Sequence, residues 1–190
     1  MARLGFGAFL APHHPIGENP MLQFRRDIAF VKHLDDLGYD EFWCGEHHSS
    51  GWEMIASPEM FLAAAGEHTK RIKLATGVIS LPYHHPFNVA QRMVQLDHMT
   101  GGRAIFGSGP GALPSDAYTL DIDPMTQRDR QDEAIDVIRR LQKACPYLLV
   151  AGEPGEREQI QRLATNNGDE VDGMPLYACI VIGATRLEDK

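Results

Sequence analysis

Three adjacent histidine pairs are the residues of this chain best suited to acid–base chemistry: His13-His14, His47-His48 and His84-His85. An imidazole has an unperturbed pKa of ~6.5, so it can gain or lose a proton close to neutral pH. Glu46 directly precedes the second pair, and its carboxylate can orient one ring or raise the pKa of that ring. All nine histidines lie at or before His98. The pattern therefore predicts proton transfer by the N-terminal part of the chain.

Short apolar segments, which we predict to be β-strands alternating with helices, position these histidines. The predicted strands are Leu4–Leu10, Glu41–Gly45, Ile72–Ser80 and Ala104–Gly107, and the predicted helices are Met21–Leu37, Pro58–Ala65, Pro86–Met99 and Asp123–Leu141. Four successive strand–helix units indicate a parallel sheet with right-handed crossovers. Because the carboxyl ends of parallel strands meet at one edge, the imidazoles should gather there, where α/β folds place their chemistry.

The length of the chain limits how complete this fold can be. A TIM (β/α)₈ barrel typically needs ~250 residues and rarely fewer than ~200, whereas this chain has 190. We therefore predict an α/β fold that is a partial TIM barrel with parallel strands, formed by residues 1–141, followed by a divergent tail over residues 142–190. In the tail, Tyr147–Ala151 and Leu176–Gly183 are compatible with two further strands. An open parallel sheet is the alternative architecture.

Each histidine pair also has an ordinary interpretation. Pro15 and Pro86 follow the first and third pairs, and a residue before proline favours extended geometry, so a turn ahead of a helix is the simplest role there. Glu46-His47-His48 could equally make surface hydrogen bonds in a loop. Metal hydrolases often use His-x-His on one strand, where alternate side chains share a face, and adjacent pairs spoil that geometry. We therefore expect no metal, and metal-dependent hydrolysis is a minor alternative.

Two glycine-bearing segments follow the third and fourth predicted strands. Thr76, Gly77 and Val78 end one strand, and Gly107–Gly111 (GSGPG) follows the other. Small residues allow a flat ring or a phosphate to approach the backbone. The alternatives are a packed strand with one glycine bulge for the first segment and an ordinary loop for the second, where Pro110 argues against a nucleotide-binding fingerprint.

The opposite, amino end of the predicted sheet carries a different pair of charges. Asp97 and Arg103 flank the Gly101-Gly102 turn that precedes the fourth strand. That end of such folds usually serves stability. We therefore predict a salt bridge between these two side chains.

Composition excludes several classes of partner. The net charge is −8 and no run of basic residues occurs, which argues against binding nucleic acid or an anionic membrane. No stretch approaches the ~18 apolar residues of a membrane span, and no export signal begins the chain. The three cysteines, at 44, 145 and 179, match neither a disulfide framework nor a zinc pattern. A cytoplasmic location is the expectation.

Several of these motifs together resemble one enzyme family. Glu46-His47-His48, the run 76–86 (TGVISLPYHHP) and the run 96–113 (LDHMTGGRAIFGSGPGAL) resemble the bacterial luciferase-like flavin-dependent monooxygenases. The run 121–141 (DIDPMTQRDRQDEAIDVIRRL) is similar to the limonene-monooxygenase-like branch of that family. The resemblance covers residues 1 to about 141, with the motifs in the order that the family has.

The resemblance implies a TIM-barrel enzyme that uses reduced FMN and O₂ to insert one oxygen atom into a small hydrophobic substrate. A separate NAD(P)H-linked flavin reductase and a homodimer are implied as partners, and deazaflavin is an alternative cofactor. By motif position, His47 matches the catalytic histidine, which assists proton movement at the flavin. The residues matched to the substrate pocket are His13, His48 and His84.

The resemblance also implies which residues bind the cofactor: Thr76, Gly77, Val78, Ser108, Gly109, Pro110 and Gly111. Gly77-Val78 matches a family site where a non-prolyl cis peptide bulges toward the flavin ring. Ser108 takes the place of a cysteine near the flavin in luciferase. Pro110 nearly replaces an arginine that reaches the phosphate, which weakens the expected phosphate contact.

The tail departs from the family pattern. Much of the family's phosphate site comes from the loop after the fifth strand, and no such motif follows Leu141. Weak FMN affinity is the expectation. The second hypothesis is therefore a truncated, catalytically impaired remnant that binds flavin or dimerises.

Overall fold

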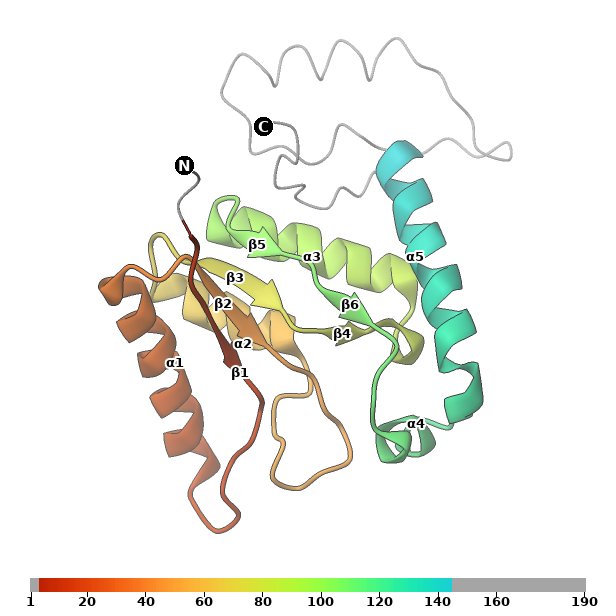
Figure 1. Cartoon of the computed structure of the whole chain (residues 1–190), viewed down its shortest axis with the longest axis horizontal. Helices are drawn as coiled ribbons and strands as arrows, with labels where there is room; N and C mark the ends of the chain where they lie inside the picture. Colours follow the sequence, from red (N-terminus) through yellow and green to blue (C-terminus); the bar gives the residue numbers. More distant parts are fainter. Residues whose placement is uncertain (1–3, 145–190) are drawn as a thin grey trace, which may run out of the picture.

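The computed structural model describes residues 4–144, which form a parallel β-sheet with helices along one face (Figure 1). The main sheet has the order β1-β2-β3-β5. Its strands are β1 (Gly7–Leu10), β2 (Glu41–Cys44), β3 (Lys73–Thr76) and β5 (Ala104–Ile105), and all its neighbours are parallel. A second, two-stranded parallel sheet pairs β4 (Ile79–Ser80) with β6 (Ser108–Gly109). The predicted α/β class and parallel pairing are confirmed.

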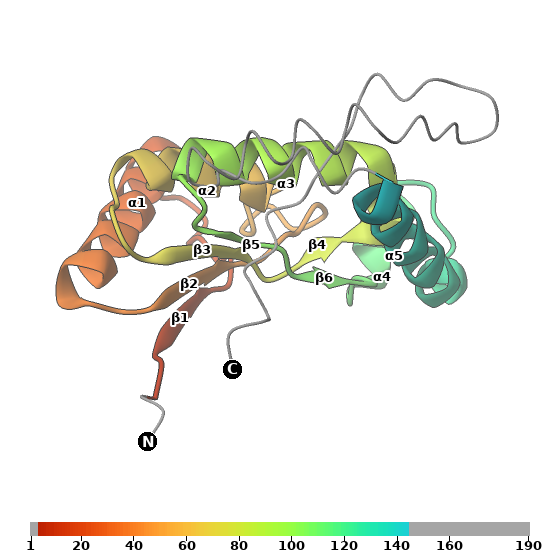
Figure 2. The same ribbon diagram turned by 90° about the horizontal axis from the view of Figure 1, so that it is seen from above.

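The helices follow the strands in the order that the sequence predicts. They are α1 (Pro20–Leu37), α2 (Pro58–Glu67), α3 (Pro86–Thr100), α4 (Pro114–Thr119) and α5 (Gln127–Ala144), with short 3₁₀ helices η1 (Leu81–Tyr83) and η2 (Pro124–Thr126). Figure 2 shows α1, α2 and α3 along one side of the sheet. None of the helices between residues 4 and 144 combines the length and the apolar character that a membrane crossing needs.

Local signals explain where α1 begins and ends. Asn19 accepts a hydrogen bond from the Met21 backbone N–H at 2.9 Å, and Pro20 occupies the first helical position. At the other end, Gly38 has a φ of 86°, a left-handed conformation that ends the helix cheaply only with glycine. The apolar face between these caps packs on the sheet. The buried core of the described chain includes Val31, Leu34, Phe42, Leu62, Leu74, Ile79, Val89, Met93 and Leu96.

Three details differ from the predictions. The predicted strand 72–80 is divided at the cis peptide Gly77-Val78, and its halves pair with different strands, β5 and β6. The predicted helix from Asp123 is divided into η2 and α5, and α4 was not predicted. The two strands expected at Tyr147–Ala151 and Leu176–Gly183 lie outside the described residues.

The predicted Asp97–Arg103 salt bridge is wrong. Asp97 accepts the Ala104 backbone N–H, at 3.2 Å. Arg103 instead donates to the carbonyl oxygens of Gly66, Thr69, Ile72 and Thr100 and to the Thr69 hydroxyl. The guanidinium of Arg103 has five N–H donors that point in different directions. Several carbonyl oxygens near the helix ends can accept from more of these donors than one carboxylate could.

Candidate active site

The loops after β1, β2 and β4 meet at the carboxyl-end edge of the sheet, where the sequence places the histidine pairs. The Gly45 backbone N–H after β2 donates to the Leu10 carbonyl of β1, and the Gly77 N–H after β3 donates to the Cys44 carbonyl. These bonds continue the strand ladder past the ends of the strands. The convergence of the histidines at one edge is therefore confirmed.

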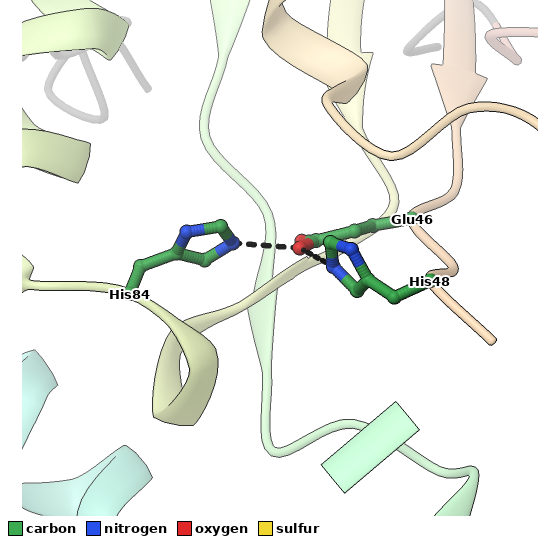
Figure 3. Close-up of side chains that lie close together, drawn as sticks. All are labelled: Glu46, His48 and His84. Atoms are coloured by element: carbon green, nitrogen blue, oxygen red, sulfur yellow. Dashed lines mark hydrogen bonds and ion pairs between the residues drawn. The ribbon is translucent and has the colours of Figure 1, made fainter. Parts of the chain in front are cut away.

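Glu46 holds two of the predicted pocket histidines. Its Oε1 lies 2.6 Å from Nε2 of His48 and 2.6 Å from Nε2 of His84, and Figure 3 shows the carboxylate between the two rings. Its other oxygen accepts the Ser80 backbone N–H at 2.7 Å. The Glu46 side chain is fully buried. One carboxylate thus ties the end of β2 to β4 and to the segment after η1.

Glu46 and His48 each stabilise the charged form of the other. Burial raises the pKa of the Glu46 carboxyl, but the hydrogen bonds from His48 and His84 outweigh burial, and the resulting pKa lies below the usual value. The pKa of His48 is raised by its hydrogen bond to Glu46, against the opposing effect of burial. The arrangement favours the ionised form of Glu46 and the protonated form of His48.

Glu46, His48 and His84 have the composition of a metal site, with donor atoms within 4.8 Å of one another. The adjacency of the histidines within each pair does not reveal this cluster, because its two imidazoles come from different pairs. The geometry nevertheless favours hydrogen bonds. Two ligands that share an ion at ~2.0–2.2 Å cannot approach each other to hydrogen-bond distance without distorting a tetrahedral site, and both N···O separations are 2.6 Å. Arg92 also lies 3.4 Å from His84 Nδ1, which favours a proton on Nε2.

His47, the predicted catalytic residue, faces two other carboxylates. Its Nδ1 lies 3.0 Å from Oδ2 of Asp116 on α4, and its Nε2 lies 3.6 Å from Oε1 of Glu53. The side chain is 25% exposed, so the ring borders solvent on one side. This geometry permits acid–base chemistry because Asp116 fixes one ring nitrogen and leaves the other to exchange a proton.

Asp116 is a site residue that the sequence reasoning missed. Besides His47, it accepts the backbone N–H groups of His48 and Ser49, at 3.1 and 2.8 Å. Burial raises the pKa of its carboxyl, but the hydrogen bonds from Ser49, His47 and His48 outweigh burial and hold the pKa below its usual value. The only local signal was Pro114 followed by Ser and Asp, which starts a short helix. Nothing in that signal points to a partner 69 residues earlier.

The predicted glycine-bearing segments lie side by side. Thr76 Oγ1 donates to the Gly107 carbonyl and accepts the Gly107 N–H, at 2.8 and 2.9 Å. The peptide Gly77-Val78 is cis, as the resemblance implied. A Cβ placed on Gly77 would lie 3.3 Å from the rings of Phe9 and Trp43, so only glycine fits there without displacing them.

Residues 108–111 run beside this peptide and are supported by α5. A Cβ on Gly109 would lie 2.9 Å from the Val78 side chain, which places the two segments in contact. Gln131 of α5 donates to the Ser108 hydroxyl at 3.3 Å. Gln127 donates to the Pro110 carbonyl at 2.9 Å. Gly111 has a φ of 82°, which favours glycine.

His13 occupies a different part of the edge from His48 and His84. Its Nε2 lies 3.1 Å from Oε1 of Glu53, and its side chain is 55% exposed. The ring meets Trp52 edge to face, with centroids 4.4 Å apart. An open cavity of about 530 Å³ is lined by His13, His14, Pro15, Ile16 and Trp52. The three predicted pocket histidines thus flank His47 without forming one cluster.

Comparison with known sequences identifies a family and close relatives. Residues 4–170 match the family model of luciferase-like monooxygenases. The chain is 58% identical over 141 residues to 4-hydroxyprotoasukamycin monooxygenase of Streptomyces nodosus and 58% identical over 139 residues to limonene 1,2-monooxygenase of Rhodococcus erythropolis. These alignments cover 74% and 73% of this chain. The chain spans 38% and 36% of the length of the two relatives.

Solved structures agree with this assignment. The oxygenating constituent of 3,6-diketocamphane monooxygenase from Pseudomonas putida, a type II Baeyer–Villiger enzyme solved with FMN, is 31% identical with a TM-score of 0.67, over 70% of this chain and 38% of that one. The monooxygenase RslO1 from Streptomyces bottropensis is 30% identical with a TM-score of 0.69, over 73% and 43% of the two chains. The described fold is a partial luciferase-like TIM barrel, as predicted.

Proposed function

The chain belongs to the luciferase-like monooxygenase family, and we propose on that premise that it acts as a flavin-dependent monooxygenase. The proposed reaction uses reduced FMN and O₂ and inserts one oxygen atom into a small hydrophobic organic molecule. The observation that carries the proposal is the position of His47. Asp116 fixes the ring of His47. Gly45, two residues before His47, lies beside Gly77, because a Cβ placed on Gly45 would be 3.5 Å from the Gly77 carbonyl oxygen.

The described residues fit the ring portion of a flavin. Gly77 and Val78 are partly exposed and residues 108–111 run beside them, whereas Thr76 is buried and holds Gly107 in place. Glycine-bearing backbone of this kind lets an aromatic ring system approach closely. Reduced FMN, when bound there, supplies the electrons that activate O₂. Because no motif of the family's phosphate site follows Leu141 in the sequence, we propose weak affinity for FMN.

His47 provides the acid–base function in this proposal. The ionised Asp116 accepts a hydrogen bond from Nδ1–H of His47, which leaves Nε2 to take or give a proton toward the reacting centre. Glu46 keeps His48 and His84 oriented beside it. The chain's own residues thus position the ring and hold the proton, which is the usual contribution of protein to cofactor chemistry.

The proposed substrate class is supported by two exposed aromatic rings and by the names of two relatives. Phe9 and Trp52 are 60% and 40% exposed, and both lie near the carboxyl-end edge. The names of the relatives specify limonene and a diketocamphane, both small hydrophobic molecules. We propose a substrate of the same size and polarity for this chain. A flavin reductase that uses NAD(P)H is the proposed partner, in the cytoplasm.

Oxygen consumption with photoreduced FMN tests the role of His47. We expect His47→Gln to slow the proton-dependent steps by about 100-fold or more, the usual contribution of general acid–base catalysis. His33→Gln, an exposed histidine on α1, is the matched control and should retain the rate of the parent chain. Equal rates for His47→Gln and the parent would remove His47 from the mechanism.

A second candidate function is favoured by the coverage of the relatives. The chain spans 38% of the length of the first relative, and β1 and β5 form open edges of the described four-stranded sheet. The alternative is an impaired remnant that binds flavin weakly or pairs with a second copy. Oxygen consumption with photoreduced FMN separates the two, because only the remnant is impaired. Titration with FMN and with deazaflavin, together with the mass in solution, tests the weak flavin binding that both candidates share, and sub-micromolar FMN binding by a monomer contradicts it.

A further inference from the structure

Glu53 is a buried carboxylate between two imidazoles that none of the roles above uses. Its Oε1 lies 3.1 Å from Nε2 of His13 and 3.6 Å from Nε2 of His47, and the residue is 6% exposed. Its other oxygen is buried and has no hydrogen-bond partner among the described residues. A buried carboxylate oxygen that lacks a hydrogen-bond partner is uncommon in folded proteins and calls for an explanation.

Backbone hydrogen bonds fix the three groups relative to one another. His13 and Glu53 form an isolated antiparallel bridge, so the loops after β1 and β2 are joined at that point. The His14 N–H also donates to the Trp52 carbonyl, and the His47 N–H donates to the Ile55 carbonyl at 3.2 Å. The alignment of His47, Glu53 and His13 is therefore built into the main chain.

The separation of 3.6 Å between Glu53 and His47 has a simple electrostatic explanation. When Asp116 accepts the Nδ1 proton of neutral His47, Nε2 carries a lone pair. That lone pair and the lone pairs of an ionised Glu53 repel each other. A proton placed between Nε2 and Oε1 would turn the contact into a hydrogen bond, which needs about 2.7–3.2 Å.

The other end of the arrangement reaches water. The His13 side chain is 55% exposed and lines the open cavity of about 530 Å³ described above. Trp52 packs edge to face against the ring. The Glu53 side chain is 4% exposed, and of its two imidazole neighbours His13, at 55%, is more open to solvent than His47, at 25%.

We propose that Glu53 and His13 relay protons between His47 and solvent. A proton leaves Nε2 of His47 for Glu53, and Glu53 passes a proton to Nε2 of His13. His13 then releases a proton to water from Nδ1, and the reverse sequence delivers one. No electrons move. Both relay residues act through His47, so the inference rests on the proposed function for its physiological role.

Other titratable groups lie around His47, Glu53 and His13 and would contribute to any pH dependence of the relay. Asp116 of α4 faces His47 from the side opposite Glu53, and its hydrogen bond keeps the Nδ1 proton in place. The buried pair of His14 and Asp27, 2.7 Å apart, joins the loop after β1 to α1. Glu46 holds its own two imidazoles. The two Glu53 contacts are therefore the route from His47 that leads to an exposed imidazole within residues 4–144.

Exchange of the Nε2 proton of His47 with water tests the relay without flavin, because Nε2 is the nitrogen that faces Glu53. In the chain labelled with ¹⁵N-histidine, magnetisation transfer from water reports this exchange by NMR. Glu53→Gln keeps the shape of the side chain, and we expect it to slow the exchange by about 10-fold. His13→Gln should have a similar effect, and the double variant should be no slower than Glu53→Gln, because both residues lie on one path.

Controls separate this outcome from a general perturbation. His33→Gln on α1 should leave the exchange unchanged. Added imidazole should restore exchange in His13→Gln, where the missing group is exposed, and not in Glu53→Gln, where it is buried. Unchanged exchange in both relay variants, with a native backbone spectrum, overturns the proposal even if His47 proves essential for oxygen consumption. Slowed exchange supports the relay even if the chain consumes no oxygen.

Discussion

The two edges of the sheet both hold buried charges, but different groups satisfy those charges. At the amino edge, Asp35 accepts the backbone N–H groups of Lys70, Arg71 and Ile72, at 2.8, 3.0 and 2.7 Å. At the carboxyl edge, imidazoles surround Glu46, Glu53 and Asp116. A backbone N–H cannot be released near neutral pH, whereas an imidazole proton can. The amino edge is therefore built for stability and the carboxyl edge for proton exchange.

The electrostatics of Asp35 agree with this contrast. Burial raises the pKa of its carboxyl, but the three backbone hydrogen bonds and the nearby Arg71 outweigh burial, so the pKa lies below the usual value. Arg103 complements it by donating to carbonyl oxygens where α2 and α3 end. These contacts lock the turns before β3 and β5.

The largest effect should come from breaking the amino edge. Asp35→Ala leaves the buried Ile72 N–H and the partly buried Lys70 and Arg71 N–H groups without their acceptor, and a buried unsatisfied donor costs ~1–3 kcal/mol. We expect a loss of about 3–5 kcal/mol in the free energy of unfolding, measured with urea. Asp36→Ala is the control, because Asp36 makes an exposed pair with Lys32 worth under ~0.5 kcal/mol. Similar losses for both variants would contradict the assigned role.

Glu46→Gln should have an intermediate effect on stability at the other edge. The amide keeps one acceptor oxygen, but its NH₂ faces N–H donors that the carboxylate accepted. We expect a loss of about 2 kcal/mol in the urea experiment, because hydrogen bonds to a charged group contribute roughly 1.5–3 kcal/mol. An unchanged midpoint would show that His48 and His84 do not depend on this carboxylate.

The free energy of unfolding should also depend on pH through Glu46 and His48 at the carboxyl edge. The folded pKa of Glu46 lies below its ordinary 4.5, so its contribution is present above pH 4.5 and is lost as the pH falls through the lowered pKa. The folded pKa of His48 lies above its ordinary 6.5, so its contribution is present below pH 6.5 and is lost as the pH rises through the raised pKa.

The contribution of the Glu46–His48 pair is measured by comparing the unfolding free energies of the parent and of His48→Gln across pH. The difference should be largest between about pH 4.5 and 6.5 and should decline on both sides. We expect it to be smaller than the effect of Glu46→Gln, because His84 still donates to Glu46 in the variant. A difference that grows steadily toward pH 9 would contradict the assigned charges.

The smallest effect should come from metal ions. The donor atoms of Glu46, His48 and His84 already hydrogen-bond one another, so zinc must displace protons and separate the groups. We expect Zn²⁺ at equimolar concentration, or EDTA, to leave the melting temperature of the chain unchanged. A rise that disappears in His84→Gln would instead establish a metal site.

Much of the fold follows from local sequence patterns. The apolar runs and the helical period predict the strands and helices, and the caps at Asn19 and Gly38 agree with the boundaries of α1. The break at Gly77-Val78 could be inferred only from the family resemblance, because periodicity continues through it. The salt bridge predicted for Asp97 and Arg103 was wrong because nearness in sequence says little about which backbone groups a buried guanidinium will meet.

The sequence by itself determined that imidazoles follow parallel strands and therefore share one edge of the sheet, because strand direction fixes where each loop begins. The sequence also predicted that Glu46 orients a ring of the pair after it, as it does His48, but the tertiary structure decided which carboxylates the other rings face. Glu53 lies six residues after His47 and Asp116 lies 69 residues after it, yet they take opposite nitrogens of the same ring. Such pairings depend on how loops fold over the sheet and on which buried charges must find a partner, and no local pattern encodes either.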